Sequence, residues 1–241
     1  MTQNSLIENE FSYLDENYKR VTFEIEEAAI KSGRNPGEIK LMAVTKTVSP
    51  LMINHMISLG VDLIGENKVQ ELLSKLDFLT KDNLEMHIIG HLQSNKVRKI
   101  IDVVSMIQSV DSVSLAREIS RQSVLHNKET DILIEVNIGD EEAKTGLPVE
   151  MLFDTASEIS EMDGIRIKGL MCVPPICDDE TTVRKYFEKT RLLNEELKSF
   201  LKDKEDISVL SMGMSSDFVS AILEGSTLVR VGSSLFGMRR Y

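Results

Sequence analysis

A lysine ends a short apolar run in the first quarter of the chain. Residues 41–45 (LMAVT) are apolar or β-branched, Lys46 follows them, and residues 47–50 (TVSP) are typical of a loop. A lysine in this place often does no more than end a strand, because its long stem carries the charge to water. Its amine has a second use, since a desolvated lysine forms a Schiff base with an aldehyde or ketone.

Two segments rich in glycine and serine follow later β-branched runs. They lie at residues 213–217 (GMSSD) and 232–234 (GSS). Serine hydroxyls and backbone amides in such loops bind phosphate oxygens. Ser215 or Ser216 could instead be a helix N-cap. The presence of two such loops favours a phosphate site that includes Ser215, Gly232 and Ser233.

Eight short runs rich in β-branched residues alternate with stretches whose apolar residues recur every three or four positions. The runs predict strands at residues 40–45, 61–65, 86–90, 103–108, 131–138, 165–171, 207–212 and 227–231. The stretches predict helices at residues 50–59, 68–79, 95–101, 112–126, 148–161, 181–201 and 216–224. One more helix is expected ahead of the first strand, over residues 8–32.

This alternation predicts an α/β protein with a parallel sheet. Eight strand-helix units in about 250 residues is the size of a (β/α)8 TIM barrel. The rival arrangement is an open doubly wound sheet, but its G-x-G-x-x-G signature is missing after the first predicted strand. No linker-like composition divides the chain. We therefore expect one barrel domain over residues 1–241, with an extra N-terminal helix.

Closure of the barrel would bring the candidate residues together. The last strand pairs with the first, and neighbouring strands lie about 4.8 Å apart, so Lys46 would lie beside the two phosphate loops. A ligand with a phosphate at one end and a lysine-reactive carbonyl at the other would span this gap. Pyridoxal 5′-phosphate has that shape. A sugar-phosphate aldolase, which uses a lysine without a cofactor, is a weaker possibility.

Arg230 lies between two valines in the last predicted strand. It could be a surface residue or an ion-pair partner, but a guanidinium in so apolar a run favours a functional role. Together with desolvation, a cation beside Lys46 would favour the neutral, nucleophilic amine. Arg230 could also donate a hydrogen bond to the pyridine nitrogen of the cofactor, which it cannot protonate.

Composition and charge exclude several other classes of protein. The net charge of −11, from 39 acidic and 28 basic residues, disfavours a nucleic-acid binder or a protein that binds anionic membranes. The N-terminus lacks the features of a signal peptide, and no apolar stretch is long enough to span a membrane. Two cysteines and four scattered histidines predict neither a disulfide framework nor a metal site. A cytoplasmic location is the expectation.

Several blocks of sequence resemble one known family. They are TK within AVTKT, GENKVQE at 65–71, HIIGHLQSNK at 87–96, KGLM at 168–171, SMGMSSD at 211–217 and GSTLVRVGSSLFGMR at 225–239. In this order they are similar to the pyridoxal phosphate homeostasis proteins, which are single-domain relatives of the alanine racemase N-terminal barrel. The resemblance extends over nearly the whole chain.

The resemblance implies a barrel that carries pyridoxal 5′-phosphate and acts in vitamin B6 and amino-acid homeostasis. It implies that Lys46 is the Schiff-base lysine and that Arg230 is the partner of the pyridine nitrogen. The phosphate would lie against Ser215, Gly232 and Ser233. Asn67 would lie beside the cofactor ring, a role that rests on the resemblance alone.

Two functions are compatible with such a site. The first is a buffer or carrier of the cofactor without robust catalysis, with apo-enzymes as possible recipients. The second is an amino-acid racemase, whose opposite base in alanine racemase is a tyrosine from a second domain and a partner subunit. The four tyrosines here, Tyr13, Tyr18, Tyr186 and Tyr241, close no predicted strand. The carrier is therefore preferred, whether any activity exists stays open, and a monomer is expected.

Overall fold

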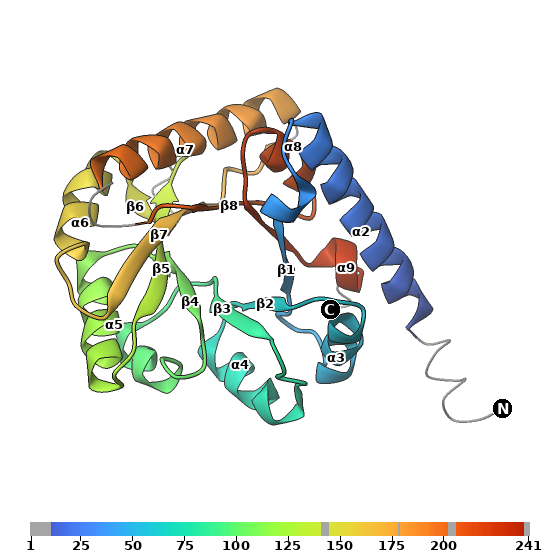
Figure 1. The fold of residues 1–241 in the computed structure, drawn as a ribbon, viewed down its shortest axis with the longest axis horizontal. Helices are drawn as coiled ribbons and strands as arrows, with labels where there is room; N and C mark the ends of the chain where they lie inside the picture. Colours follow the sequence, from blue (N-terminus) through green and yellow to red (C-terminus); the bar gives the residue numbers. More distant parts are fainter. Residues whose placement is uncertain (1–10, 141–144, 178, 202–205, 239–241) are drawn as a thin grey trace.

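Eight parallel strands form a closed barrel in the computed structural model, which describes residues 11–140, 145–177, 179–201 and 206–238 (Figure 1). The strands are β1 (Lys40–Val44), β2 (Leu63–Glu66), β3 (Glu85–Ile88), β4 (Met106–Val110), β5 (Thr130–Asn137), β7 (Ile165–Cys172), β8 (Val209–Met214) and β9 (Leu228–Val231). Their order is β4-β3-β2-β1-β9-β8-β7-β5, and pairing of β4 with β5 closes the ring. The predicted TIM barrel is confirmed.

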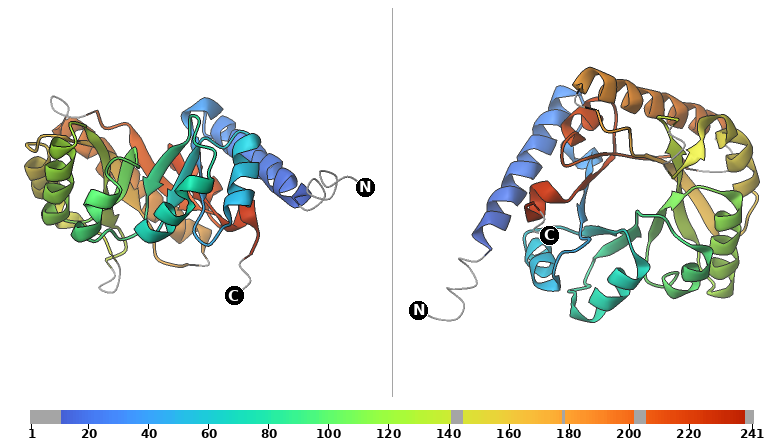
Figure 2. Two further views of the ribbon diagram at one scale, coloured as in Figure 1. Left: turned by 90° about the horizontal axis from the view of Figure 1, so that it is seen from below. Right: turned by 180° about the vertical axis from the view of Figure 1, so that it is seen from behind.

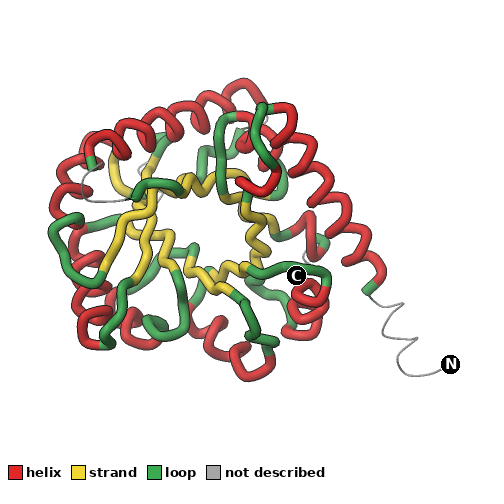
Figure 3. Tube along the Cα trace, viewed as in Figure 1, coloured by secondary structure: helices red, strands yellow, loops and turns green. Residues whose placement is uncertain are grey.

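The strands carry little polar surface because both of their faces are covered. Every residue of β2, β4 and β9 is buried, as expected for a parallel sheet that is packed on its inner face by side chains and on its outer face by helices. The ring of strands inside a ring of helices is clear in Figure 3. The carboxyl ends of all eight strands therefore meet at one mouth of the barrel.

Helices surround the barrel (Figure 2). They are α2 (Ser12–Lys31), α3 (Pro50–Ser58), α4 (Val69–Lys75), α5 (Val113–Leu125), α6 (Leu152–Ile159), α7 (Glu180–Phe200), α8 (Phe218–Leu223) and α9 (Ser233–Phe236). Short 3-10 turns lie at η1 (Pro36–Glu38), η2 (Leu76–Phe78), η3 (Ser94–Lys99) and η4 (Val149–Met151). Within the described part of the chain, no helix is both long enough and apolar enough to cross a membrane.

The N-terminal helix α2 packs against the last two helices, α8 and α9. Helix α2 runs along the outside of the barrel (Figure 1). Asn17 donates from Nδ2 to the carbonyl of Leu235 in α9 at 2.9 Å, and Arg20 donates to the carbonyl of Ser234 at 3.0 Å. The predicted first helix is confirmed over its described part, and residues 8–10 lie outside the described residues.

The segment between β3 and β4 differs from its prediction. The helix expected at 95–101 is the 3-10 turn η3, and β4 starts at Met106 rather than at 103. The amides of Val103 and Val104 donate back to the carbonyl of Ile100, so these residues continue the turn instead of pairing with a strand. A two-residue strand, β6 (Leu147–Pro148), which the sequence pattern did not indicate, pairs with Val136 and Asn137 at the carboxyl-terminal end of β5.

Candidate functional site

A pocket of about 470 Å³ opens at the carboxyl ends of the strands. All six residues expected to hold the cofactor line it: Lys46, Asn67, Ser215, Arg230, Gly232 and Ser233. Five more residues line the pocket without having been expected there: Val44, Ile89, Val173, Met214 and Ser216. Each of the five lies at or just after the end of a strand, so strand boundaries were the signal that could have found them.

Pairing of β1 with β9 places Lys46 beside the second glycine-serine loop. Met42 is level with Arg230, and Ala43 is level with Val231. Lys46 and Gly232 therefore follow neighbouring strand ends. Their closeness follows from barrel closure, as expected, although the two residues are far apart in the sequence.

Ser215 joins the two glycine-serine loops. Its Oγ accepts from the amide of Gly232 at 3.0 Å and from that of Ser234 at 3.2 Å. Two backbone amides from one loop thus converge on a hydroxyl of the other. The N-cap of α8 is Asp217, so neither Ser215 nor Ser216 occupies that position. A phosphate oxygen can accept from the same amides, and the serine hydroxyl can donate to it.

The loop that carries Ser215 is stiffened by its own backbone contacts. The amide of Met214 donates to Asp217 Oδ1 at 2.6 Å, and the amide of Asp217 donates to the carbonyl of Met214 at 3.0 Å. Burial raises the pKa of Asp217. Gly213 has a φ of +91°, and a Cβ there would lie 2.5 Å from Ala221 Cβ. Only glycine allows α8 to pack this close to the strand end.

Arg230 is buried in the barrel with 4% of its surface exposed. Its Nη1 donates to the carbonyl of Ser211 at 2.7 Å and to Ser211 Oγ at 2.6 Å, while Nη2 donates to the carbonyl of Cys172 at 2.7 Å. Burial lowers the pKa of Arg230, yet a guanidinium keeps its proton in proteins. Its Nε and the second N–H of Nη2 make no hydrogen bond to any described residue, so both can donate to a ligand in the pocket.

A line of side chains continues from Arg230 through the barrel interior. Ser211 Oγ donates to Gln108 Oε1 at 2.8 Å, and Gln108 Nε2 lies 2.9 Å from His87 Nδ1. Burial lowers the pKa of His87, so the imidazole is neutral and its Nδ1 accepts from the amide group of Gln108. His87 is thus a core histidine with a hydrogen-bond partner, and it helps to orient the groups behind Arg230.

Asn67 directly follows β2 and lines the pocket because of the path of the backbone there. The backbone passes directly over the end of β3, where a Cβ on Gly90 would lie 2.6 Å from the carbonyl oxygen of Asn67 and 2.8 Å from its Cα. Gly90 therefore permits a contact that any larger residue would block. Such a close approach decides the place of Asn67, and the sequence pattern alone does not reveal it.

The tyrosines lie elsewhere. Among the described residues, Tyr13 and Tyr18 belong to α2 and Tyr186 to α7, and none of the three lines the Lys46 pocket. Tyr241 lies outside the described residues. The described part of the pocket therefore offers no tyrosine as a second base opposite Lys46.

The thiols of the two cysteines do not line the pocket, although the backbone carbonyl of Cys172 accepts from Arg230. Burial raises the pKa of the Cys172 thiol to about 11, and Thr190 Oγ1 lies 3.3 Å from its sulfur. A thiol in this state is a poor nucleophile and packs as a small apolar side chain. Cys177 is partly exposed in the loop that precedes α7.

Comparison with known proteins places the chain among relatives of similar size. The family model for the alanine racemase N-terminal domain matches residues 27–240. A protein of Aquifex aeolicus named pyridoxal phosphate homeostasis protein is 41% identical over 226 residues, which cover 94% of this chain and 98% of that protein. The protein of the same name in Escherichia coli K12 is 34% identical over 228 residues and is covered to 96%.

A solved structure gives the same fold. PipY of Synechococcus elongatus, in a structure with pyridoxal phosphate bound, matches with a TM-score of 0.77 and 31% identity. The match covers 89% of this chain and all of the PipY chain.

Proposed function

This chain belongs to the pyridoxal phosphate homeostasis protein family, and from that membership we propose that it binds pyridoxal 5′-phosphate in the Lys46 pocket. The observation that carries the proposal is the convergence of a lysine, a buried arginine and two serine-rich loops on one pocket of about 470 Å³. A relative with 31% identity is described with this cofactor bound. The pocket has the size of a small-molecule site.

The donors around the pocket fit both ends of this cofactor. The hydroxyls of Ser215 and Ser233 and the amides of the Gly232 loop would hold the phosphate. Lys46 would supply the amine for covalent attachment, and Arg230 would donate to the pyridine nitrogen through its unused Nε. When bound, the cofactor supplies an aldehyde carbon that reacts with primary amines and a ring that withdraws electrons.

The protein residues, in this proposal, hold and shield the cofactor. Val44, Ile89 and Val173 line part of the pocket with apolar side chains, which would pack against the cofactor. Arg230 keeps the ring nitrogen unprotonated, since a guanidinium cannot donate its proton fully, and an unprotonated ring is a weaker electron sink. A site built this way suits a buffer or carrier better than a robust catalyst.

Attachment to Lys46 gives the first prediction. The purified protein incubated with pyridoxal 5′-phosphate should show a visible absorbance band, and reduction with borohydride should fix one pyridoxyl group to the chain. Peptide mass spectrometry should place that group on Lys46, and Lys46→Ala should lose both the band and the adduct. A neighbouring surface variant, Lys68→Ala, should keep both. An adduct of equal yield on Lys46→Ala would refute the assignment of this lysine.

A further inference from the structure

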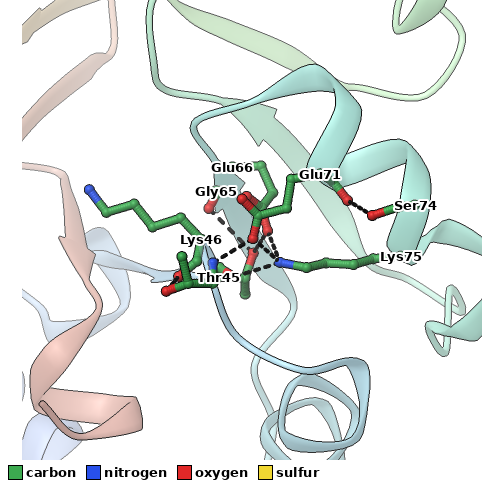
Figure 4. Close-up of polar contacts among 8 residues, drawn as sticks. Thr45, Lys46, Gly65, Glu66, Glu71, Ser74 and Lys75 are labelled. Atoms are coloured by element: carbon green, nitrogen blue, oxygen red, sulfur yellow. Dashed lines mark hydrogen bonds and ion pairs between the residues drawn. The ribbon is translucent and has the colours of Figure 1, made fainter. Parts of the chain in front are cut away.

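The two peptide groups that flank Lys46 are held by one pair of side chains on α4. Lys75 Nζ donates to the carbonyl of Thr45, on one side of Lys46, at 2.8 Å. Glu71 Oε1 accepts from the amide of Thr47, on the other side. Lys75 Nζ and Glu71 Oε1 are themselves 2.7 Å apart, and Figure 4 shows the residues of this cluster. The pair lies four residues apart, on one face of the helix.

All three N–H donors of Lys75 are used within the cluster that it forms with Thr45, Glu66 and Glu71. The third contact of Lys75 Nζ is with Glu66 Oε1, at 2.7 Å. The same carboxylate oxygen also accepts from Thr45 Oγ1 at 2.8 Å. An ammonium has three protons and here meets three acceptors. The Lys75 side chain is 9% exposed and Glu66 is fully buried. A second lysine thus lies near Lys46, but its hydrogen bonds withdraw it from reaction with an aldehyde.

The cluster affects its two carboxyl groups in opposite directions. Burial alone would raise the pKa of Glu71, but its bonds to Lys75 and to the Thr47 amide lower that pKa on balance. Burial raises the pKa of Glu66 and outweighs its bond to Lys75. Glu71 is therefore the ionised partner that both Lys75 and the backbone after Lys46 require.

The residue after Lys46 has a backbone conformation that needs this support. Thr47 has a φ of +64°, in the left-handed region that β-branched residues rarely adopt. Its Oγ1 donates to the carbonyl of Lys46 at 2.6 Å. A strained turn of this kind persists only when its surroundings hold it, and the bond from the Thr47 amide to Glu71 is such a restraint.

We propose that Glu71 and Lys75 are positioning residues for Lys46. They fix the peptide on each side of its Cα, so that the side chain leaves the strand end on the side opposite the cluster (Figure 4). Neither lines the pocket. The inference rests on the proposed role of Lys46 and adds the residues that direct its amine to the cofactor aldehyde. Displacement of a reacting group by about 1 Å can slow a reaction about a hundredfold.

The test separates attachment from binding. Glu71→Ala removes the acceptor for the Thr47 amide, while Glu71→Gln keeps an oxygen there. The matched control is Glu195→Ala, which removes the carboxylate of a surface pair with Arg191, also four residues apart and at 2.7 Å. Two quantities are measured on each folded variant: the rate of formation of the borohydride-reducible bond with pyridoxal 5′-phosphate, and the affinity for pyridoxine 5′-phosphate, which has no aldehyde.

Glu71→Ala should slow bond formation at least about tenfold and leave the affinity for pyridoxine 5′-phosphate within about twofold. Glu71→Gln should recover part of the rate, and Glu195→Ala should match the wild type. Equal rates for Glu71→Ala and the wild type would overturn the inference, and so would a parallel loss of rate and affinity in both Glu71 variants. If the wild type itself forms no reducible bond, the proposed function fails instead, which is a different result.

Discussion

The burial and hydrogen bonds of Arg230 narrow the roles that its sequence context allows. Between two valines it could have been a surface residue or an ion-pair partner. In the structure the side chain is buried, and its Nη atoms donate to two backbone carbonyls and one hydroxyl. None of these three bonds involves a carboxylate. The guanidinium is therefore oriented by the barrel wall, with two of its five N–H donors, on Nε and Nη2, not used by these bonds. An arginine held this firmly can present Nε to a ring nitrogen without a further loss of side-chain entropy.

Replacement of Arg230 should weaken the cofactor site. Arg230→Gln removes a charged donor worth about 1.5–3 kcal/mol, so the affinity for pyridoxal 5′-phosphate should fall about tenfold or more, with a shift in the visible band. Titration followed by absorbance measures both. Arg184→Gln, which breaks a surface contact with Glu224, is the control. If the thermal unfolding midpoint shows that the variant is folded, an unchanged affinity and spectrum would refute the proposed contact between Arg230 and the cofactor.

Strands β1 and β3 carry a charged group at the opposite, amino-terminal mouth of the barrel. Glu85 begins β3, its Oε2 lies 3.7 Å from His87 Nε2, and its Oε1 lies 2.8 Å from Lys40 Nζ. The contacts with His87 and Lys40 lower the pKa of Glu85 from 4.5 to about 2. The ionised carboxylate is thus favoured by the folded state, and the ion pair ties the first strand to the third.

The lowered pKa of Glu85 predicts a dependence of stability on pH. Because the folded pKa lies below the unfolded one, the contribution is complete above pH 4.5 and is lost as the pH falls towards 2. Glu85→Gln should be less stable than the wild type at pH 7, and the difference should shrink between pH 4.5 and 2. Urea unfolding at several pH values measures this. A difference that stays constant over this pH range would contradict the prediction.

The whole molecule is a barrel whose described pocket has one lysine and no tyrosine. A racemase needs acid-base groups on both faces of the substrate α-carbon, and only the Lys46 face is supplied by the described residues. Covalent storage needs only the lysine and the donors that hold the phosphate and the ring. At the scale of the whole chain, our proposal is therefore retention and release of the cofactor, and the test below distinguishes it from turnover.

Retention without turnover can be measured directly. The protein loaded with cofactor and incubated with L-amino acids in deuterium oxide should show no sustained exchange at the α-carbon and no D-isomer above that of Lys46→Ala. The same loaded protein should reactivate an apo-enzyme that requires pyridoxal phosphate. Sustained exchange with formation of D-isomer would favour the racemase. Reactivation no faster than from free cofactor at the concentration released would argue against direct delivery.

Much of the architecture was predictable because it depends on local pattern. Alternation of β-branched runs with helical periodicity is repeated eight times, and such repetition leaves few folds. The main exception, at residues 95–104, is local as well. There the carbonyl of Ile100 accepts from the amides of Val103 and Val104. A 3-10 turn therefore replaces the expected helix, and the strand starts later than expected. Patterns of apolar residues do not encode that choice between hydrogen-bond partners.

By itself, the sequence determined the alternation of strands and helices, and with it the mouth at which Lys46, Ser215, Gly232 and Ser233 meet, because carboxyl ends of parallel strands lie on one side of a barrel. Only the tertiary structure decided how these residues are held. The Ser215 bridge, the Ser211 and Cys172 acceptors of Arg230, and the contacts of Glu71 and Lys75 around Lys46 join residues from different elements. Such hydrogen bonds depend on distances of a few tenths of an ångström, which no linear pattern specifies.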